Sequence, residues 1–277
     1  MAKDGIKRRT KGFLKRLNAF SSFRDDATTL KGLKYKFSNM PRKIPGQLSL
    51  FGWDLEYVDG LSLLCSIDLL VLKGLNDFVP KHEHPVILDC GANIGISVLH
   101  YKRQFPSARI TAFEPDPQII PVLKRNLARN HASDVEVIEA AVWIKEGESA
   151  FFCEGADGSR LITIDRTVSP SVVVKTVNLA NFISSGIDLI KMDIEGVESE
   201  VTVSLADKLG VVRNMVIECH IENKRIEPFA RLLEALAKAG FSTSINSFGA
   251  WRDLVRQPRK LENEFDQYLM VAAWRDN

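Results

Sequence analysis

The sequence predicts an α/β fold in which helices cover both faces of a mostly parallel sheet. From Pro85 onward, short apolar runs alternate with stretches of helical periodicity, the pattern of strands and helices that follow one another around a parallel sheet. Apolar residues make up 45% of the 277-residue chain and charged residues 26%, a composition typical of globular proteins. We expect this α/β domain over residues 85–277, preceded by a basic extension at 1–43 and a helical or irregular cap segment at 44–84.

Seven strands are predicted, each a short apolar run bounded by turn residues. They are expected at 86–90, 109–114, 135–142, 188–193, 215–220, 241–247 and 268–274. Helices are expected at 61–78, at about 94–105, after Asp116–Pro117 and at 228–239. Pro80 and Pro106 stop the first two helices, Pro121 bends the third near its start, and Gly240 ends the last.

The segment between the third and fourth predicted strands spans about 45 residues, which is too long for a bare crossover helix. Alternating apolar patterns at 150–153 and 172–177 predict an added hairpin over the carboxyl edge of the sheet, where a substrate would bind. A glycine-rich loop at 155–159 either covers the same edge or forms a plain surface turn.

The four cysteines are scattered and form no CxxC pair. This argues against a zinc site or a disulfide framework and favours a reducing compartment. The charged N-terminus is not followed by the apolar stretch of a secretory signal, and no run approaches the ~18 apolar residues of a membrane span. We therefore expect a cytoplasmic protein.

Charge is distributed unevenly along the chain. Residues 1–43 contain 13 Lys and Arg but only three acids, whereas the remainder carries a net charge of −8. Basic and apolar residues interleave within residues 1–20. That segment is either an amphipathic helix that makes peripheral contact with an anionic membrane or an acidic partner, or a solvated tail.

A glycine-containing turn directly after the first strand is the sharpest local signal. The sequence VILDCGANIG places Asp89 at the strand end, Gly91 in the turn and Gly95 at the start of the helix. Because parallel sheets bind ligands beyond the carboxyl ends of their strands, Gly91 would let the backbone approach a ligand, and Gly95 would let the helix pack on the strand. Asp89 can meet a cationic amino group, and Glu114, after the second strand, can accept both hydroxyls of a ribose. The pattern predicts a nucleoside site.

A dinucleotide site, as in an NAD-linked oxidoreductase, is an alternative interpretation of this turn. Such sites use G-x-G-x-x-G so that bare backbone meets a pyrophosphate. Here Asn93 stands in place of the second glycine, and no glycine follows three residues after Gly95. The turn therefore suits a nucleoside ligand without a pyrophosphate, such as S-adenosylmethionine (SAM).

Three segments together carry a resemblance to a known family. LDCGANIG with FEPD, then IKMDIEGVESEV, then VIECHIE resemble the FkbM-type methyltransferases over roughly residues 85–222. The resemblance implies a seven-stranded Rossmann-like fold, SAM as methyl donor, and O-methylation of hydroxyls on sugars, glycans or natural products. The cofactor-binding residues that it implies are Asp89, Gly91, Asn93, Gly95, Glu114 and Ala141.

The ends of the fourth and fifth strands carry the candidate catalytic groups. Asp193 follows strand four, while Glu218 and His220 lie two residues apart on one face of strand five. His220 is the natural general base because its unperturbed pKa is near 6.5, with Asp193 orienting it or contacting the acceptor. Glu195 and Glu198 are interpreted as acids of a turn and a helix surface.

Two other roles for these groups stay open. Asp193, Glu218 and His220 could hold Mg²⁺ or Mn²⁺ through oxygen and nitrogen ligands, which we do not favour. Glu218 and His220 could instead only hydrogen-bond the Asp193 turn. We expect a small-molecule or glycan acceptor and no nucleic acid, since the catalytic part of the chain is acidic. An N- or nucleic-acid methyltransferase and a catalytically silent SAM-binding module are the alternatives.

Overall fold

A computed structural model describes residues 24–156, 158–162, 171–183, 186–222, 226–248 and 265–275. At its centre lies a seven-stranded sheet of order β12-β13-β11-β10-β3-β4-β5. These strands are β3 (Val86–Cys90), β4 (Arg109–Phe113), β5 (Glu136–Ile138), β10 (Ile187–Met192), β11 (Val212–Glu222), β12 (Ser242–Phe248) and β13 (Phe265–Trp274). Neighbouring strands from β5 to β11 are parallel, and β13 is antiparallel to both β11 and β12. The predicted α/β fold with a mostly parallel seven-stranded sheet is confirmed.

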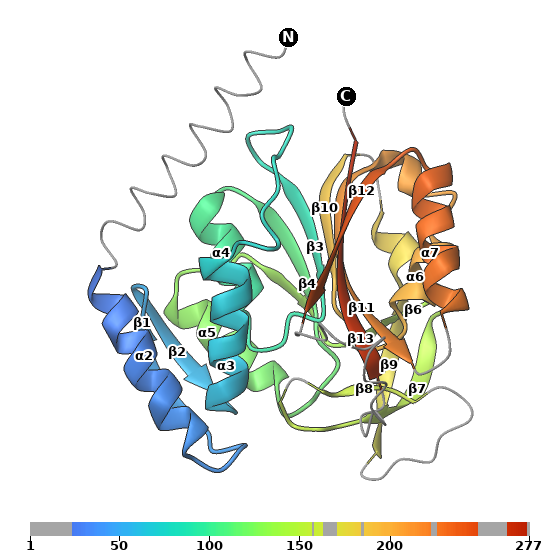
Figure 1. Cartoon of the computed structure of the whole chain (residues 1–277). Coiled ribbons are helices and arrows are strands. Elements are labelled where there is room, and N and C mark those ends of the chain that lie inside the picture. The colour runs from blue at the N-terminus through green and yellow to red at the C-terminus, as the bar shows by residue number, and fades with distance from the viewer. Residues whose placement is uncertain are drawn as a thin grey trace, which may run out of the picture.

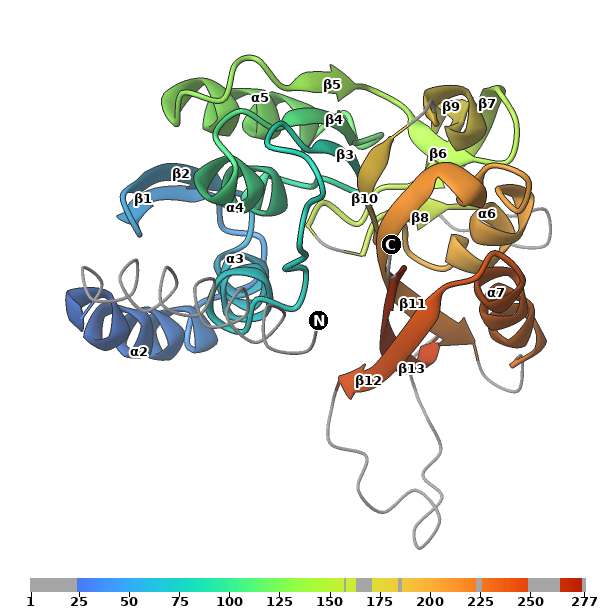
Figure 2. The same cartoon turned by 90° about the horizontal axis from the view of Figure 1, so that it is seen from above.

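Helices cover both faces of this sheet, as Figure 1 and Figure 2 show. The helices α4 (Ile96–Gln104) and α5 (Ile120–Arg129) lie on one side, and α6 (Glu198–Ser204) and α7 (Glu227–Lys238) on the other. Alternate strand residues supply the two cores: Ile87 and Leu189 face the first pair of helices, whereas Leu88 and Ile190 face the second. The near-continuous burial of β3 and β10 follows from packing on both faces.

The predicted third strand, 135–142, is wrong as a single element. The chain forms β5, bends at Ala140, whose N–H bonds the carbonyl of Ile138, and continues as β6 (Ala141–Trp143) in another sheet. That sheet has the order β6-β9-β7-β8, with β7 at Gly147–Phe152, β8 at Arg160–Leu161 and β9 at Ser171–Asn178. Strands β7 and β9 pair antiparallel, which confirms the added hairpin. A short 3₁₀ helix follows β9 at Leu179–Phe182, and another precedes β11 at Leu209–Val211.

The N-terminal elements pack against the α4–α5 side of the sheet. They are α2 (Arg24–Ser38), the antiparallel pair β1 (Gly46–Leu50) and β2 (Trp53–Tyr57), α3 (Gly60–Ser66) and a π-helical stretch, Ile67–Leu72. Buried residues of these elements share one core with α4 and α5. Residues 1–20, for which a membrane contact was considered, lie outside the described residues. Within the described ranges, no helix has both the length and the apolar character needed to cross a membrane.

Two predicted helices have different bounds in the structure. The helix expected at 61–78 ends at Leu72. Its last turns have π-type hydrogen bonds, such as that from Lys73 N–H to the Asp68 carbonyl. Gly74 then adopts a φ of +59°, which ends the helical conformation. The helix expected to start at Asp116 begins at Ile120. Pro121 lies in its first turn, where no backbone donor is required, so it starts the helix instead of bending it.

Candidate active site

A cavity of about 360 Å³ lies at the carboxyl ends of β3, β4, β10 and β11. Its walls combine the glycine turn after β3, the end of β4, the start of β6, the turn after β10 and the C-terminal part of β11. The cap segment adds Ser62, Ser66 and Leu69 from α3 and the π-helical stretch. The predicted location of the site, at the carboxyl edge of the parallel strands, agrees with this cavity.

Gly91 allows the backbones of two turns to touch. Its φ is +81°, and a Cβ atom there would lie 1.8 Å from the carbonyl oxygen of Asp193. The N–H of Asp193 bonds the Cys90 carbonyl at 3.1 Å, which holds the two turns together. We expected Gly91 to let a ligand approach, but the structure shows that it accommodates the neighbouring turn. Gly95 similarly accommodates a helix, since its Cβ would lie 2.8 Å from Leu123 Cδ1 of α5.

Glu114 lies at the end of β4 and lines the cavity, as expected for a ribose acceptor. Its two oxygens accept hydrogen bonds from the backbone N–H groups of Asn93, at 2.8 Å, and Asp116, at 2.9 Å. Burial raises the pKa of Glu114 to about 7, against the lowering effect of those two bonds. Near neutral pH, a ligand that donates hydrogen bonds would favour the ionised carboxylate.

Asp89 is fully buried and is not among the residues that line the cavity. Its carboxylate accepts a 2.5 Å hydrogen bond from Ser97 Oγ and lies 3.5 Å from Lys191 Nζ. Burial raises the pKa of Asp89, and Lys191 opposes this effect. The expected contact with a cationic amino group of a ligand is therefore met by a cation of the protein itself.

Lys191 is a functional candidate that the sequence reasoning missed. It is buried in β10, and its Nζ donates to the Gly91 carbonyl at 2.6 Å and lies 3.6 Å from Asp193 Oδ2. Its pKa is raised: burial lowers it, but Asp89 and Asp193 outweigh burial. A lysine inside a mostly apolar strand was the available signal, because a buried Lys requires paired charges.

The glycine-rich loop covers the end of the cavity that the glycine turn after β3 forms. Asn93 Nδ2 donates to the Ala156 carbonyl at 2.9 Å, and Ser159 Oγ donates to Asp116 Oδ2 at 2.8 Å. Ala156, Gly158 and Ser159 line the cavity, as does the predicted Ala141 at the start of β6. Of the two interpretations left open for this loop, covering the edge of the sheet is the one that the structure supports.

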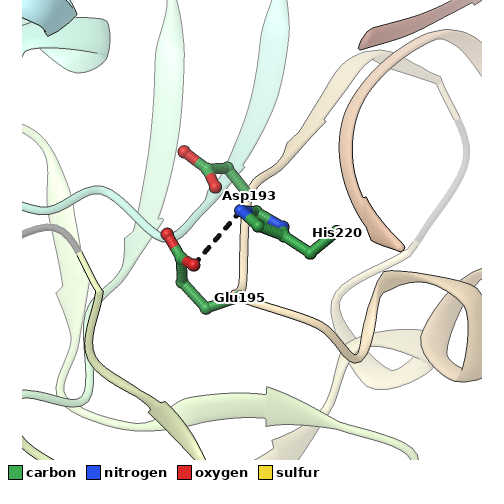
Figure 3. Close-up of side chains that lie close together, drawn as sticks. All are labelled: Asp193, Glu195 and His220. Atoms are coloured by element: carbon green, nitrogen blue, oxygen red, sulfur yellow. Dashed lines mark ion pairs between the residues drawn. The ribbon is translucent and has the colours of Figure 1, made fainter. Parts of the chain in front are cut away.

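The candidate catalytic residues converge at the other end of the cavity. Asp193, Glu218 and His220 all line it, together with Glu195. Figure 3 shows Asp193 and Glu195 on the turn after β10, with the ring of His220 from β11 between them and an ion pair from Glu195 to the ring. The parallel pairing of β10 with β11 brings these groups together.

His220 is bonded by a carboxylate on each side of its ring. Nδ1 lies 2.9 Å from Glu198 Oε1, and Nε2 lies 3.1 Å from Glu195 Oε2. Burial lowers the pKa of His220, but the charges of Glu198 and Glu195 outweigh burial and raise this pKa well above its usual value. A carboxyl group at each ring nitrogen favours the protonated ring, which is a poor proton acceptor.

Glu198 does not lie on a helix surface, so that interpretation was wrong. It is 2% exposed. Its Oε1 accepts backbone hydrogen bonds from Ile194 at 3.2 Å and Gly196 at 3.0 Å as well as the contact from His220. Burial opposes ionisation, but His220 and these bonds lower the pKa of Glu198. Glu198 therefore fixes the turn that carries Glu195.

Asp193 has an unsatisfied oxygen, and Glu218 beside it resists ionisation. Among the described residues, the buried Oδ1 of Asp193 has no hydrogen-bond partner. Burial, followed by repulsion from Asp193, raises the pKa of Glu218 to about 8. A cationic or proton-donating ligand would stabilise both groups.

A divalent ion fits this cluster poorly. Ligand atoms of Asp193, Glu195 and His220 lie within 4.8 Å of one another, so the geometric grouping exists, with Glu195 where we had expected Glu218. Both ring nitrogens of His220, however, already contact carboxylates. Ligation would remove the proton that those carboxylates stabilise.

The sheet order, the glycine turn and the acid after β4 define the class of protein. They form the Rossmann-like fold of class I SAM-dependent methyltransferases. Residues 89–243, more than half of the chain, match the Methyltransferase FkbM domain. The chain belongs to the FkbM methyltransferase family.

Relatives of known name agree with this assignment. The chain is 31% identical to Methyltransferase sdnD of Sordaria araneosa over 237 residues, which cover 73% of this chain and 85% of that protein. It is 26% identical to the 2-O-methyltransferase NoeI of Sinorhizobium fredii over 187 residues, 59% of this chain and 74% of that one. It also resembles M. jannaschii TYW2, solved with AdoMet, at a TM-score of 0.47 and 12% identity, over 84% of this chain and 87% of that one.

Proposed function

We propose that this methyltransferase transfers a methyl group from SAM to a hydroxyl group of a sugar, glycan or natural-product acceptor. The observation that carries the proposal is the convergence of three carboxyl groups and an imidazole ring, those of Asp193, Glu195, Glu218 and His220, on the cavity that the glycine turn also lines. Methylation of a neutral hydroxyl requires a group that takes up its proton, and this cluster supplies carboxylates for that purpose. The name of the 2-O-methyltransferase relative is consistent with oxygen as the acceptor atom.

SAM fits the two ends of the cavity on chemical grounds. Glu114 offers a carboxylate whose ionised form a ribose diol would stabilise, and Ala141 and Asn93 lie on the same part of the wall. Asp193 offers the orphaned oxygen Oδ1 to a cationic group. When bound, SAM supplies an electrophilic methyl group on a sulfonium centre.

The residues of the chain then position the acceptor and manage its proton. Asp193 and Glu218 line the cavity at the carboxyl ends of β10 and β11, where they can accept hydrogen bonds from acceptor hydroxyls. Positioning alone can lower such a barrier by ~7–11 kcal/mol. His220, engaged on both ring nitrogens, sets the charge and orientation of the acids around it.

The cap segment at 44–84 is proposed to shape the acceptor side of the cavity. Ser62 and Ser66 of α3 and Leu69 of the π-helical stretch line it. Two hydroxyls beside an aliphatic side chain match a polyhydroxylated acceptor with apolar ring faces. π-type turns inside helices occur frequently at functional sites.

The proposal is tested by binding and turnover. Isothermal titration calorimetry with SAM and S-adenosylhomocysteine measures the cofactor site. Formation of S-adenosylhomocysteine is then followed with a panel of sugars, oligosaccharides and hydroxylated natural products, and with amines and RNA as alternative acceptors. Transfer to a hydroxyl is the expected result; transfer to amines or RNA alone would replace the proposed acceptor class, and absence of SAM binding would remove the proposal.

A further inference from the structure

We infer that Glu195 is the residue that takes the proton from the acceptor hydroxyl, and that His220, held by Glu198, is the positioning residue that aims it. The inference rests on the proposed function and names a different base from the histidine that sequence patterns indicate. It stands on three features of the turn after β10: the backbone of Glu195, the free oxygen of its side chain, and the chain of contacts behind it.

The backbone of Glu195 is held in a conformation that few side-chain-bearing residues adopt. Its φ is +59°, and Gly196 follows at +104°. A glutamate in the left-handed region is unusual, and such strain persists only where the surrounding structure imposes it, which is most often at functional sites. Glu198 imposes it here, because its Oε1 accepts the N–H groups of Ile194 and Gly196 on both sides of Glu195.

One oxygen of Glu195 is held and the other is free. Oε2 lies 3.1 Å from His220 Nε2, as the dashed line in Figure 3 marks, and the other oxygen points away from the ring. Among the described residues, that second oxygen has no hydrogen-bond partner. The side chain is 20% exposed and lines the cavity. A carboxylate anchored through one oxygen presents the other to a substrate.

The contacts behind Glu195 link two acids through an imidazole ring. Burial raises the pKa of Glu195, and the charge of His220 opposes this effect. Glu198, 2% exposed, holds Nδ1 of His220, and Nε2 of the same ring holds Glu195. The ring also packs edge-on against Tyr268, with the centroids 5.2 Å apart. Since both nitrogens of His220 face carboxylates, the ring is a donor on both sides, and the acid at the cavity end of this chain is the group able to accept a proton.

The transfer step balances with these groups alone. The acceptor oxygen forms a bond to the methyl carbon while the carbon–sulfur bond breaks and its electron pair goes to sulfur. The proton of the acceptor O–H goes to the free oxygen of Glu195, and from there to solvent through the open side of the cavity. Asp193 and Glu218 face the same space and hold the hydroxyl in line.

The decisive experiment compares Glu195→Gln with Glu200→Gln, a matched change on α6 outside the cavity. With an acceptor found in the panel above, kcat of Glu195→Gln is expected to fall at least ~100-fold, the usual range for loss of a general base, with the Kd for SAM within twofold of wild type. Glu200→Gln is expected to keep the wild-type kcat. Wild-type turnover in Glu195→Gln would overturn the inference and leave the proposed function intact, whereas loss of SAM binding by the wild type would remove both.

A second variant separates the catalytic role from a structural one. Glu195→Asn places in the left-handed position a residue that tolerates it, so the midpoint of thermal unfolding is expected to rise by roughly 2–4 °C while kcat falls as in Glu195→Gln. A gain in stability together with a loss of turnover marks a strained functional residue. Loss of both, or of neither, would contradict this assignment.

The positioning role of His220 has a spectroscopic readout. In ¹⁵N-histidine-labelled protein, with the His220 signals assigned from His220→Gln, both ring nitrogens are expected to be protonated at pH 7.5. Glu198→Gln, which keeps an acceptor oxygen but loses the charge, should shift this titration to lower pH. The charged groups facing the ring are Glu195, Glu198 and Asp193. A neutral His220 at pH 7.5 in the wild type would overturn the positioning role.

His220→Gln should lower kcat by about 100-fold through misplacement of Glu195, with the KM for SAM little changed. A rise of similar size in the KM for SAM, without a change in kcat, would assign His220 to cofactor binding instead.

Discussion

The two ends of the cavity are built from different materials. At the proposed cofactor end, most of the contacts involve backbone groups. Gly91 packs against the carbonyl of Asp193, and Glu114 accepts hydrogen bonds from two backbone N–H groups. At the reaction end, side chains from β10, β11 and α6 hold one another, as Glu198, His220 and Glu195 do. The first end depends on local chain geometry and the second on charge balance. Substitutions at the two ends should therefore affect SAM binding and turnover differently.

Gly91→Ala should have the largest effect, because it damages both ends at once. A Cβ at this position would lie 1.8 Å from the Asp193 carbonyl oxygen, with the backbone at a φ of +81°. Overpacking and the left-handed conformation together should cost about 3 kcal/mol of unfolding free energy. Chemical denaturation measures this change, with Gly210→Ala as the control, since nothing lies within 4 Å of a Cβ there. An equal loss in both variants would contradict the close approach of the two turns.

Asp193→Asn and His220→Ala should separate the two ends. Each is expected to lower kcat at least ~100-fold, on the scale of acid–base catalysis, because each disturbs the carboxylate cluster. The SAM affinity measured by calorimetry should change little in His220→Ala, since the glycine turn and Glu114 stay in place, and should fall moderately in Asp193→Asn, which removes a charge offered to the cationic ligand. Normal turnover in both variants would mean that this cluster is not the reaction centre.

Glu114→Gln should weaken SAM binding and leave kcat nearly unchanged. Loss of a hydrogen bond to a charged acceptor should weaken SAM binding about tenfold, with kcat at saturating SAM nearly unchanged. A glutamine can accept from only one of the two N–H groups that Glu114 satisfies, so thermal unfolding must be recorded as well. Glu136→Gln, an exposed acid on the neighbouring β5, serves as the control. Unaltered SAM affinity in Glu114→Gln would place the ribose elsewhere.

The reaction end should also make stability depend on pH. The pKa of Glu218 is raised to about 8 from an ordinary 4.5, so the folded protein binds this proton more tightly than the unfolded chain does. The contribution of Glu218 to stability is therefore fully present below pH 4.5 and is lost as pH rises toward 8. Glu218→Gln should remove at least ~1.4 kcal/mol of that fall, the equivalent of one pKa unit, in denaturation curves at pH 5 and pH 8.5. Identical pH profiles of stability in wild type and variant would show that the pKa of Glu218 is not raised in the folded protein.

EDTA treatment should have the smallest effect. Because both nitrogens of His220 contact carboxylates, turnover should remain close to the untreated value. A loss of activity that added Mg²⁺ restores would show that a metal, not the imidazolium, balances the acids at this end.

Several elements could be predicted because their causes are local. The strand Val86–Cys90 has the predicted bounds, since a run of apolar residues between proline and glycine has few alternatives. The third strand was misplaced because its apolar run continues through Ala140, and only the bend there shows that its second half joins another sheet. The helix over 61–78 was too long because periodicity does not distinguish an α-helix from the π-helical stretch that follows Ser66.

The same division applies to the site. Glycine spacing and the acids after each strand indicated the fold class, the family and the edge of the sheet where the cavity lies, because backbone conformation depends on neighbours in the chain. Only the tertiary structure decided which acids pair with which cations. Asp89 meets Lys191 from a neighbouring strand, and His220 meets Glu195 and Glu198 from a turn and a helix 22 or more residues away. The pKa values of these groups depend on burial and on the distances between side chains, and the sequence alone does not specify either quantity.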